Sequence, residues 1–467
     1  MNGSGSGVRL GEGLVRELER QVREAQSQWH SPAVSVGVVR GGALVWSTHI
    51  GSARLDPVTA PTDDTAYMIG SITKTFTAVL IMTLRDAGRL SLDERLEKFL
   101  PQTRHGAVTI RSMLAHASGL QREPVGRIWE NLDAPDRERL LRELEDAEQV
   151  LPVHFAFHYS NLAFGLLGQI VEQLYDRPWG DVVTERILAP LEMKNTALAP
   201  DDAGRALGYL VNPHTGVATL EPRFDLKATA PVGGLWSTVA DLARYAAFVA
   251  DPIDEILSPD TMDEMCRPVI MADIEGWARA YGLGYDLQRT GERVLAGHGG
   301  AMPGFLAGLR VRRQDGVGAV VFANTTAGAE TTALAGQLIN TVLESEPALA
   351  PLWVPSQPQP DFDGLLGSWW TEGEEIVFEV RDNVLWSRIP GGLPMADTRF
   401  DRTHADRFRA VAGRERGELL EITRGSGGDV ERMHFATYAL TRTPTAFANL
   451  LDAAGRPAAS AKGPTRI

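Results

Sequence analysis

The sequence places a hydroxyl and an amine at a spacing that suits nucleophilic catalysis. Ser71 and Lys74 lie three residues apart at the start of an apolar run, and on a helix this spacing brings both side chains to one face. A serine hydroxyl becomes a good nucleophile when a base takes its proton, and a lysine amine is such a base only where its surroundings keep it partly neutral. The pair therefore predicts an activated serine at a helix start, where backbone N–H groups favour developing negative charge.

The scarcity of lysine supports a chemical role for Lys74. The Ser-x-x-Lys spacing occurs by chance in many chains, and a helical lysine is usually a solvated surface residue. Only five of the 46 basic residues are lysines, and Lys74 alone has a serine three positions before it. Because apolar neighbours such as Phe76 and Val79 would bury this helix, a lysine there is costly unless it has a function. Arginine, which the chain otherwise prefers, could not serve as a base.

A second candidate motif is Tyr159-Ser160-Asn161. A tyrosine beside a lysine is a candidate general base because the ammonium favours the phenolate, and an asparagine amide can hold a substrate amide. The alternative is structural: a buried tyrosine followed by Asn161 as the cap of the next helix. The motif alone does not decide between the two.

The third candidate is Gly297-His298-Gly299-Gly300-Ala301, directly after a predicted strand at 294–296. Small residues at this point let a substrate backbone lie close. The N–H of Ala301 could then pair with that of Ser71 as an oxyanion hole.

A metal site is not expected. His154 and His158 have the i, i+4 spacing of a zinc pair, but the alternation with phenylalanine favours extended chain and no third ligand stands out. His116 is expected in a polar loop. We therefore predict neither a metal nor a cofactor.

Composition excludes several classes of protein. The 467 residues are 43% apolar and 23% charged, as in an ordinary globular protein, and the net charge of −14 argues against nucleic acid or an anionic membrane as a partner. Cys266 is the only cysteine, so an intramolecular disulfide and a thiolate metal cluster are excluded. The chain shows no apolar run of eighteen residues and no secretory signal in its first thirteen, from which we expect a cytoplasmic protein.

The predicted elements describe an α/β (α+β) domain over residues 14–345, with a helical insertion in an antiparallel sheet. Apolar spacing predicts a helix at 14–29, and alternation predicts a hairpin next, before the mostly helical stretch from Ser71 to about residue 200. Strand patterns return at 294–296, 306–311 and 317–322, and a helix follows at 330–343. The simplest packing is a sheet built from both chain ends.

A smaller antiparallel β-barrel is predicted after a proline-rich linker at 346–361. Five prolines fall within this part of the chain, which indicates extended backbone. Short strands separated by glycine and aspartate turns then fill residues 362–445. Their patterns lie at 367–370, 375–380, 384–387, 418–422 and 434–440. Residues 1–13 and 446–467 are expected to be a flexible N-terminus and a tail.

The three motifs, in this order, resemble those of the penicillin-binding protein and class C β-lactamase superfamily: Ser-x-x-Lys, Tyr-x-Asn and Lys/His-x-Gly. Supporting stretches are similar too, at 109–120, at 233–238 and at Pro303-Gly304-Phe305. The resemblance covers about residues 14–345.

By this resemblance Ser71 is the acylated nucleophile, and Lys74 and Tyr159 share its proton. The resemblance does not settle which of the two is the base. Asn161 and His298 would orient the substrate, and the N–H groups of Ser71 and Ala301 would form the oxyanion hole. The implied substrate-binding residues are Gly299, Gly300, Gly234, Leu235 and Trp236. His298 stands where true β-lactamases carry a lysine, which puts recognition of a β-lactam carboxylate in doubt.

The superfamily includes β-lactamases, D,D-peptidases, esterases, D-aminopeptidases and thioesterases that release and macrocyclise nonribosomal peptides. The first two work outside the cytoplasm, so the missing leader favours the last three. The C-terminal β domain resembles the lipocalin-like module of the cyclising thioesterases. Arg442 in this domain could bind a peptide carboxylate, but its position fits an ordinary surface arginine at least as well.

The leading interpretation is therefore a thioesterase that takes a peptidyl thioester from a peptidyl carrier protein, forms an ester on Ser71 and closes a ring. The alternative is an esterase or D-amino-acid-specific peptidase, in which water accepts the acyl group. A silent scaffold is disfavoured because every catalytic position is filled.

Overall fold

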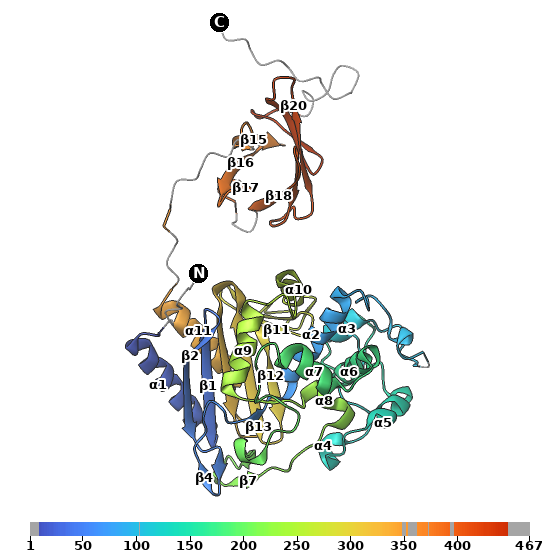
Figure 1. Ribbon diagram of the computed structural model, residues 1–467, viewed down its shortest axis with the longest axis vertical. Helices are drawn as coiled ribbons and strands as arrows, with labels where there is room; N and C mark the ends of the chain where they lie inside the picture. Colours follow the sequence, from blue (N-terminus) through green and yellow to red (C-terminus); the bar gives the residue numbers. More distant parts are fainter. Residues whose placement is uncertain are drawn as a thin grey trace. The chain divides into compact units, whose positions relative to one another are not determined.

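The computed structural model describes residues 9–101, 103–347, 352–353, 362–371, 373–392 and 397–446. The chain forms two compact units, residues 1–349 and 350–467. The predicted flexible N-terminus, linker 346–361 and tail 446–467 lie largely outside the described residues, so these boundaries stay predictions. Each unit is drawn in Figure 1 and is described by itself below.

The first unit is organised around an eight-stranded antiparallel sheet in the order β2-β1-β14-β13-β12-β11-β10-β9. The N-terminal strand β1 pairs with β14 near the C-terminal end of the unit, with Val36 opposite Val321. The prediction of a sheet built from both chain ends is therefore confirmed. The strands are β1 (Ala33–Arg40), β2 (Ala43–Gly51), β9 (Ile270–Met271), β10 (Arg279–Tyr281), β11 (Asp286–Thr290), β12 (Arg293–Met302), β13 (Phe305–Arg312) and β14 (Val317–Ala323).

Helices cover both faces of this sheet, so successive residues of a strand enter two different cores. In β14, Val321 belongs to the core beneath α1 (Glu12–Trp29) and α11 (Thr331–Ser345), whereas Val320 and Phe322 belong to the other. On that second side lie α9 (Val239–Ala250) and the helical insertion, and most of the insertion is drawn to the right of the sheet in Figure 1. Burial on both faces explains why β14 is apolar throughout.

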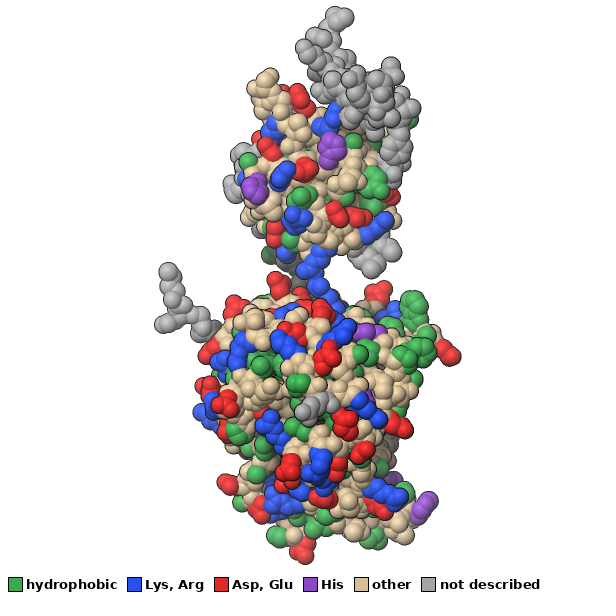
Figure 2. All heavy atoms as spheres, turned by 90° about the vertical axis from the view of Figure 1, so that its right-hand side faces the viewer, with side chains coloured by type: hydrophobic (Ala, Val, Ile, Leu, Met, Phe, Trp, Pro, Cys, Tyr) green, Lys and Arg blue, Asp and Glu red, His purple; other side chains and the backbone are tan. Residues whose placement is uncertain are grey.

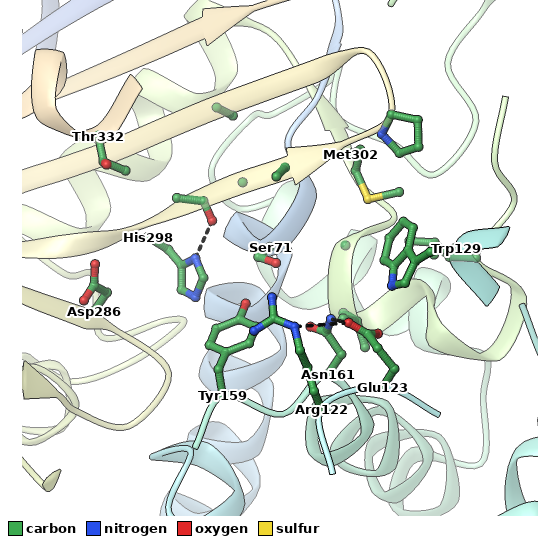
Figure 3. A pocket seen from close by; sticks show the side chains of 18 of the residues that line it. Ser71, Arg122, Glu123, Trp129, Tyr159, Asn161, Asp286, His298, Met302 and Thr332 are labelled. Atoms are coloured by element: carbon green, nitrogen blue, oxygen red, sulfur yellow. Dashed lines mark hydrogen bonds and ion pairs between the residues drawn. The ribbon is translucent and has the colours of Figure 1, made fainter. Parts of the chain in front are cut away.

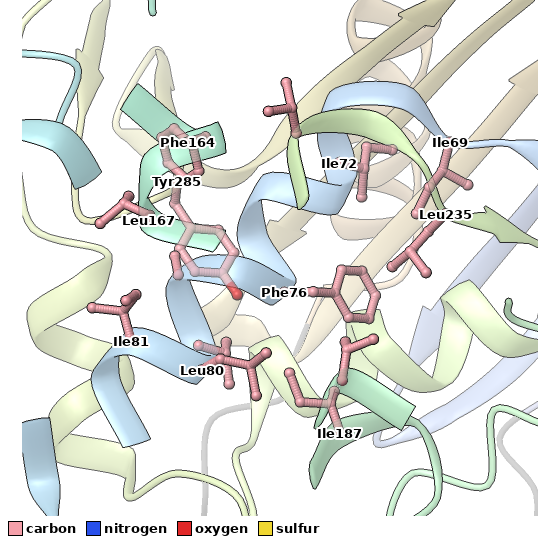
Figure 4. Packing of buried hydrophobic residues seen from close by; sticks show 14 of the residues in the cluster. Ile69, Ile72, Phe76, Leu80, Ile81, Phe164, Leu167, Ile187, Leu235 and Tyr285 are labelled. Carbon is pink, nitrogen blue, oxygen red and sulfur yellow. The ribbon is translucent and has the colours of Figure 1, made fainter. Parts of the chain in front are cut away.

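The insertion holds α2 (Thr73–Asp86), preceded by the short turn η1 (Gly70–Ile72), inside the second core. Every residue of α2 from Thr73 to Met82 is buried, Lys74 included. Figure 4 shows the surrounding apolar side chains, among them Phe76 and Leu80, and the Phe76 ring stacks on Tyr245 at 3.9 Å between centroids. The predicted burial of this helix is confirmed.

Shorter elements complete the insertion. Thr109 caps α3, because its side chain accepts a hydrogen bond from the N–H of Ser112. The helices are α3 (Ile110–Leu114), α4 (Ile128–Asn131), α5 (Arg137–Arg142), α6 (Asn161–Tyr175), α7 (Trp179–Val183), α8 (Ala230–Gly233) and α10 (Pro259–Met265). The small strand pairs are β3 (Arg54–Leu55) with β4 (Val58–Thr59), β5 (Tyr67–Met68) with β8 (Trp236–Ser237), and β6 (Tyr209–Val211) with β7 (Ala218–Leu220).

The second unit is an eight-stranded antiparallel meander that closes on itself. Trp370 and Thr441 exchange two backbone hydrogen bonds at 2.8 and 3.0 Å, which join the first strand to the segment after the last. The predicted barrel is confirmed, with one strand pattern divided into β21 and β22 and with two strands, β18 and β19, that the sequence analysis missed. The strands are β15 (Gly367–Thr371), β16 (Glu374–Arg381), β17 (Val384–Arg388), β18 (Thr398–His404), β19 (Arg407–Ala410), β20 (Leu419–Arg424), β21 (Val430–Phe435) and β22 (Tyr438–Leu440).

Helix hydropathy and surface charge are relevant to the partners that the protein can bind. In the part of the chain that the structure describes, no helix is both long and apolar enough to cross a membrane. On the face drawn in Figure 2, acidic and basic side chains are interspersed over the first unit.

Replacing Gly284 by alanine should destabilise the core around α2. Gly284 has a φ of +88°, and a Cβ there would lie 2.2 Å from the Cβ of Ala78. A left-handed conformation costs an L-residue about 1–2 kcal/mol, and overpacking adds about 1–3 kcal/mol. Gly291→Ala is the matched control, since φ is +60° and nothing lies within 4 Å of the new Cβ. Scanning calorimetry should show a clearly larger loss for Gly284→Ala, and equal losses would contradict this packing.

Candidate active site

The three sequence motifs meet at a cavity of about 900 Å³ in the first unit. Ser71, Tyr159, Asn161 and the stretch from His298 to Ala301 all line it. Figure 3 shows Ser71 between His298 on one side and Asn161 and Glu123 on the other. Segments more than 200 residues apart in the sequence therefore face one space.

Two glycines let the Ser71 turn lie directly against strand β12. A Cβ on Gly70, whose φ is +50°, would lie 2.7 Å from the backbone nitrogen of Ala301, and a Cβ on Gly300 would lie 1.9 Å from the carbonyl oxygen of Ile69. Only glycine fits at such an approach. This packing brings the backbones of Ser71 and Ala301 to the same wall of the cavity, as the predicted oxyanion hole requires.

Lys74 is fully buried, and its amine contacts the nucleophile. Its Nζ lies 2.8 Å from Ser71 Oγ and donates to the carbonyl of Val232 at 2.9 Å. Burial lowers the pKa of Lys74 well below its usual range, and the charge of Glu123 opposes this only in part. A neutral amine keeps two N–H groups and one lone pair, so it can donate to Val232 and still accept the Ser71 proton.

Tyr159 is partly buried beside this pair. Its ring centroid lies 5.0 Å from Lys74 Nζ and 5.0 Å from the guanidinium carbon of Arg122. Burial raises the pKa of the Tyr159 phenol above its usual value, although a hydrogen bond with Ser71 acts in the opposite direction. The phenol therefore keeps its proton at neutral pH, and the geometry favours Lys74 over Tyr159 as the first base.

Asn161 does not cap α6. Ser160 is the cap, since its hydroxyl accepts from the N–H of Ala163 at 3.0 Å, so the expectation for Asn161 is wrong. Asn161 is the first helical residue, and its Nδ2 donates to Glu123 Oε1 at 2.7 Å. Its Oδ1 is buried and has no partner among the described residues. Glu123 thus orients the amide so that an acceptor remains for a substrate N–H.

His298 is a neutral acceptor in this cavity. The motif lies inside strand β12 instead of after a strand, because β12 continues to Met302. His298 Nδ1 lies 2.5 Å from the carbonyl of Gly299, which can only accept, so Nδ1 carries the proton. Burial, with the nearby Lys74 amine, lowers the pKa of His298 to about 3. The remaining Nε2 lone pair is buried without a partner among the described residues.

Other predicted residues lie elsewhere. Gly234, Leu235 and Trp236 do not line the cavity, which Val232 and Gly233 line instead. The Leu235 carbonyl accepts from the N–H of Ile69 and so supports the Ser71 turn from behind.

Arg442 lies in the second unit, where its guanidinium donates to the carbonyls of Gly364, Leu366 and Ser368 and covers the Trp369 ring at 3.9 Å. Three of its five N–H groups are engaged in this way, and the binding of a substrate carboxylate by Arg442 stays a prediction.

The sequence analysis missed several residues of the site. Glu123 and Arg122 stand in a loop, where charged side chains normally face solvent, and nothing in their spacing distinguishes them. Arg279 and Asp286 also line the cavity. His116, expected in a polar loop, is fully buried against Tyr159, with 4.1 Å between ring centroids, and its Nδ1 accepts from the N–H of Ser160.

The site has three defining parts: a serine at the start of a buried helix, a desolvated lysine one turn later, and a neighbouring β strand that completes the site. Together they define the β-lactamase and penicillin-binding-protein class of serine hydrolases. The Beta-lactamase family model matches residues 17–344, and the chain belongs to this family. A second model, for a domain of unknown function (DUF7586), matches residues 358–442.

Known proteins with related sequences or folds include three that bear on function. Beta-lactamase-like protein 2 of Dictyostelium discoideum is 31% identical over 269 residues, 54% of this chain, which spans about half (49%) of that protein. The D-aminopeptidase of Brucella canis is 28% identical over 436 residues, 91% of this chain and 79% of that protein. D-amino acid amidase from Ochrobactrum anthropi SV3, solved with D-phenylalanine, has a TM-score of 0.62 at 22% identity and covers 71% of this chain and 98% of that one.

The pH dependence of Ser71 acylation should distinguish the two candidate bases. If Lys74 accepts the proton, the acylation rate falls as the pH drops through the lowered pKa of Lys74 and is constant above that pKa. The rate should therefore reach its plateau well below the usual lysine pKa of about 10.4. If a Tyr159 phenolate were the base, its raised pKa would make the rate climb beyond about pH 10. Intact mass after timed reaction with a fluorophosphonate measures the rate, with Ser71→Ala as the control. A rate still rising at the highest pH would contradict the assignment to Lys74.

Proposed function

We propose that the first unit is a serine amidohydrolase that removes a D-configured N-terminal residue through an ester on Ser71. The observation that carries this proposal is the fully buried Lys74 amine 2.8 Å from Ser71 Oγ, in a cavity that also presents the Glu123 carboxylate. The first feature supplies an acyl-transfer centre. The second supplies an anion where a substrate ammonium can bind.

The reaction follows from the contacts. Ser71 Oγ attacks the scissile carbonyl carbon while Lys74 takes the hydroxyl proton, and the oxyanion forms toward the N–H groups of Ser71 and Ala301. The C–N bond then breaks, and the leaving amine receives a proton from the Lys74 ammonium directly or through the Tyr159 hydroxyl. Water attacks the ester, Lys74 takes its proton, and Ser71 is restored with release of the acid.

Glu123 is placed to select a free amine in the acyl group. Its loop is fixed to the start of α6, since the Arg122 carbonyl accepts from the N–H of Asn161 at 2.6 Å and the Gln121 carbonyl accepts from Ser160 Oγ at 2.8 Å. Asn161 Nδ2 and, at 3.5 Å, Arg122 Nε both face Oε1 of the carboxylate, which leaves Oε2 for an ammonium. Apolar residues next to it offer contacts to a substrate side chain: Ile128, Trp129 and Met302.

The relatives support a D-residue at this position. A D-aminopeptidase aligns with 91% of the chain, and the enzyme of similar fold is a D-amino acid amidase. His298 is held neutral and presents only a lone pair, so it cannot itself pair with a β-lactam carboxylate as the usual lysine of β-lactamases does.

The peptide-cyclising thioesterase predicted from the sequence shares the Ser71 ester and differs only in the acceptor, an amine of the same peptide in place of water. That interpretation drew on the added β domain, whereas the relatives named above are a D-aminopeptidase and a D-amino acid amidase. Hydrolysis is therefore the main proposal.

The configuration and the acceptor can be tested together. D-alanine p-nitroanilide should be hydrolysed with a kcat/KM at least about 100-fold above that of the L-isomer, a difference within reach of a fixed ammonium and side-chain site. Ser71→Ala should abolish turnover of both. Equal rates for the two isomers would contradict D-selectivity. A cyclic product from a peptidyl thioester ending in a D-residue would instead restore the cyclase interpretation.

Glu123→Gln should weaken recognition of the free amine and leave Asn161 held, because the new amide oxygen still accepts from Asn161 Nδ2. Loss of a charge-assisted contact costs about 1.5–3 kcal/mol, so kcat/KM for D-alanine p-nitroanilide should fall about 10- to 100-fold, mainly through KM. Its N-acetyl derivative should be a poor substrate of both proteins.

The matched control is Glu130→Gln, a nearby exposed carboxylate on α4 that does not line the cavity. A loss in this control equal to that in Glu123→Gln would contradict the ammonium site.

A further inference from the structure

A charged cluster that the mechanism above does not use lines the cavity beside His298. Asp286 on β11 accepts from Arg310 Nη2 at 2.6 Å and from Arg279 Nε at 2.8 Å. Asp286 and Arg310 are buried, whereas the Arg279 side chain is 53% exposed. Asp286 and Arg279 are among the residues that line the cavity.

The strand register explains why Asp286 and Arg310 meet. Asp286 is paired with Gly297, and Gly297 is paired with Arg310, so the three residues form one row across β11, β12 and β13. Because Gly297 has no side chain, the Arg310 guanidinium reaches Asp286 across the intervening strand. Burial favours the neutral acid, but Arg310 and Arg279 together hold the pKa of Asp286 below its usual range. The carboxylate is therefore ionised.

One carboxylate thus faces two guanidinium groups, which leaves one positive charge in excess. Arg310 neutralises the carboxylate charge through its 2.6 Å contact with Asp286 Oδ2, and both of these side chains are buried. Arg279 uses only Nε in this contact, and its two Nη groups have no hydrogen-bond partner among the described residues. A half-exposed guanidinium with two terminal N–H groups at a cavity wall is the donor pattern that a carboxylate binds.

Asp286, which Arg279 contacts at 2.8 Å, and Glu123 lie on different sides of Ser71. In Figure 3, Asp286, His298 and Thr332 lie on one side of Ser71, and Glu123 and Trp129 lie on the other. Thr331 and Thr332, in the first turn of α11, line the same cavity, and the start of a fifteen-residue helix favours an anion. The preceding Glu330 also lines the cavity, but its side chain is exposed to solvent.

We propose that Arg279 binds the free carboxylate of the leaving amino acid, so that the substrates are short zwitterionic peptides, above all dipeptides, in place of C-terminal amides. This inference rests on the proposed function. A dipeptide bound across Ser71 places its ammonium at Glu123 and its carboxylate at Arg279, with the scissile bond between. The site therefore selects substrates whose length places one charged end at Glu123 and the other at Arg279.

Binding to a Ser71→Ala protein tests this assignment without turnover. D-alanyl-glycine and D-alanyl-glycinamide share the ammonium and the scissile bond and differ only in the terminal charge. Calorimetry at low ionic strength should show the acid binding at least tenfold more tightly than the amide. Adding Arg279→Gln should abolish that preference, and binding of the amide by the same variant shows that its cleft is folded.

Arg289→Gln is the matched control, because Arg289 is an exposed arginine on the neighbouring strand β11 that does not line the cavity, and it should retain the preference. Equal affinities for acid and amide, no measurable binding of the acid, or a preference that survives Arg279→Gln each overturn the proposal. Failure of wild-type protein to hydrolyse D-aminoacyl compounds, with the preference intact, would instead remove the proposed function and leave the carboxylate site standing.

Discussion

The active site depends on one interaction: the amine of Lys74 is buried away from water next to the hydroxyl of Ser71. A fully buried Lys74 has lost its hydration, and no carboxylate of the residues that the structure describes bonds to its Nζ in exchange, so the neutral form is favoured. That state needs the apolar core around α2, the Val232 carbonyl and the nearby rings of Tyr159 and Phe164. The same burial keeps His298 neutral and Tyr159 protonated, so one physical cause sets the protonation of all three groups near Ser71.

Backbone proximity is the second constraint, and glycine supplies it. Gly70 and Gly300 let the Ser71 turn touch strand β12, and Gly297 lets Arg310 reach Asp286 across that strand. The sheet therefore carries both the wall of the oxyanion site and a charged cluster. Since β12 pairs with neighbours on both sides, these positions are fixed by the register, which suits a preorganised site.

The sequence was sufficient to predict the features that depend on local periodicity or on short motifs. Periodicity predicted α1, α2 and α11, strand patterns predicted β1, β2, β13, β14 and part of β12 but not β9 to β11, and Ser71, Lys74, Tyr159 and His298 were found by type and spacing. It was not sufficient where tertiary contacts decide. Glu123 and Arg279 look like ordinary surface charges in the sequence, and Ser160 and Asn161 are both good caps, so only packing shows which one points into the cavity. Strand β18 was missed because its charged residues hide the alternation.

The most direct test of this account is the protonation state of Lys74 itself. With only five lysines, a protein labelled with ¹³C at lysine Cε gives few signals, and Lys74→Arg assigns one of them. We expect that signal to titrate well below the usual lysine value of about 10.4, with the amine largely neutral at the pH of catalysis. A Lys74 signal that titrates together with those of the exposed lysines would contradict the central claim, because a permanent ammonium cannot take the proton of Ser71.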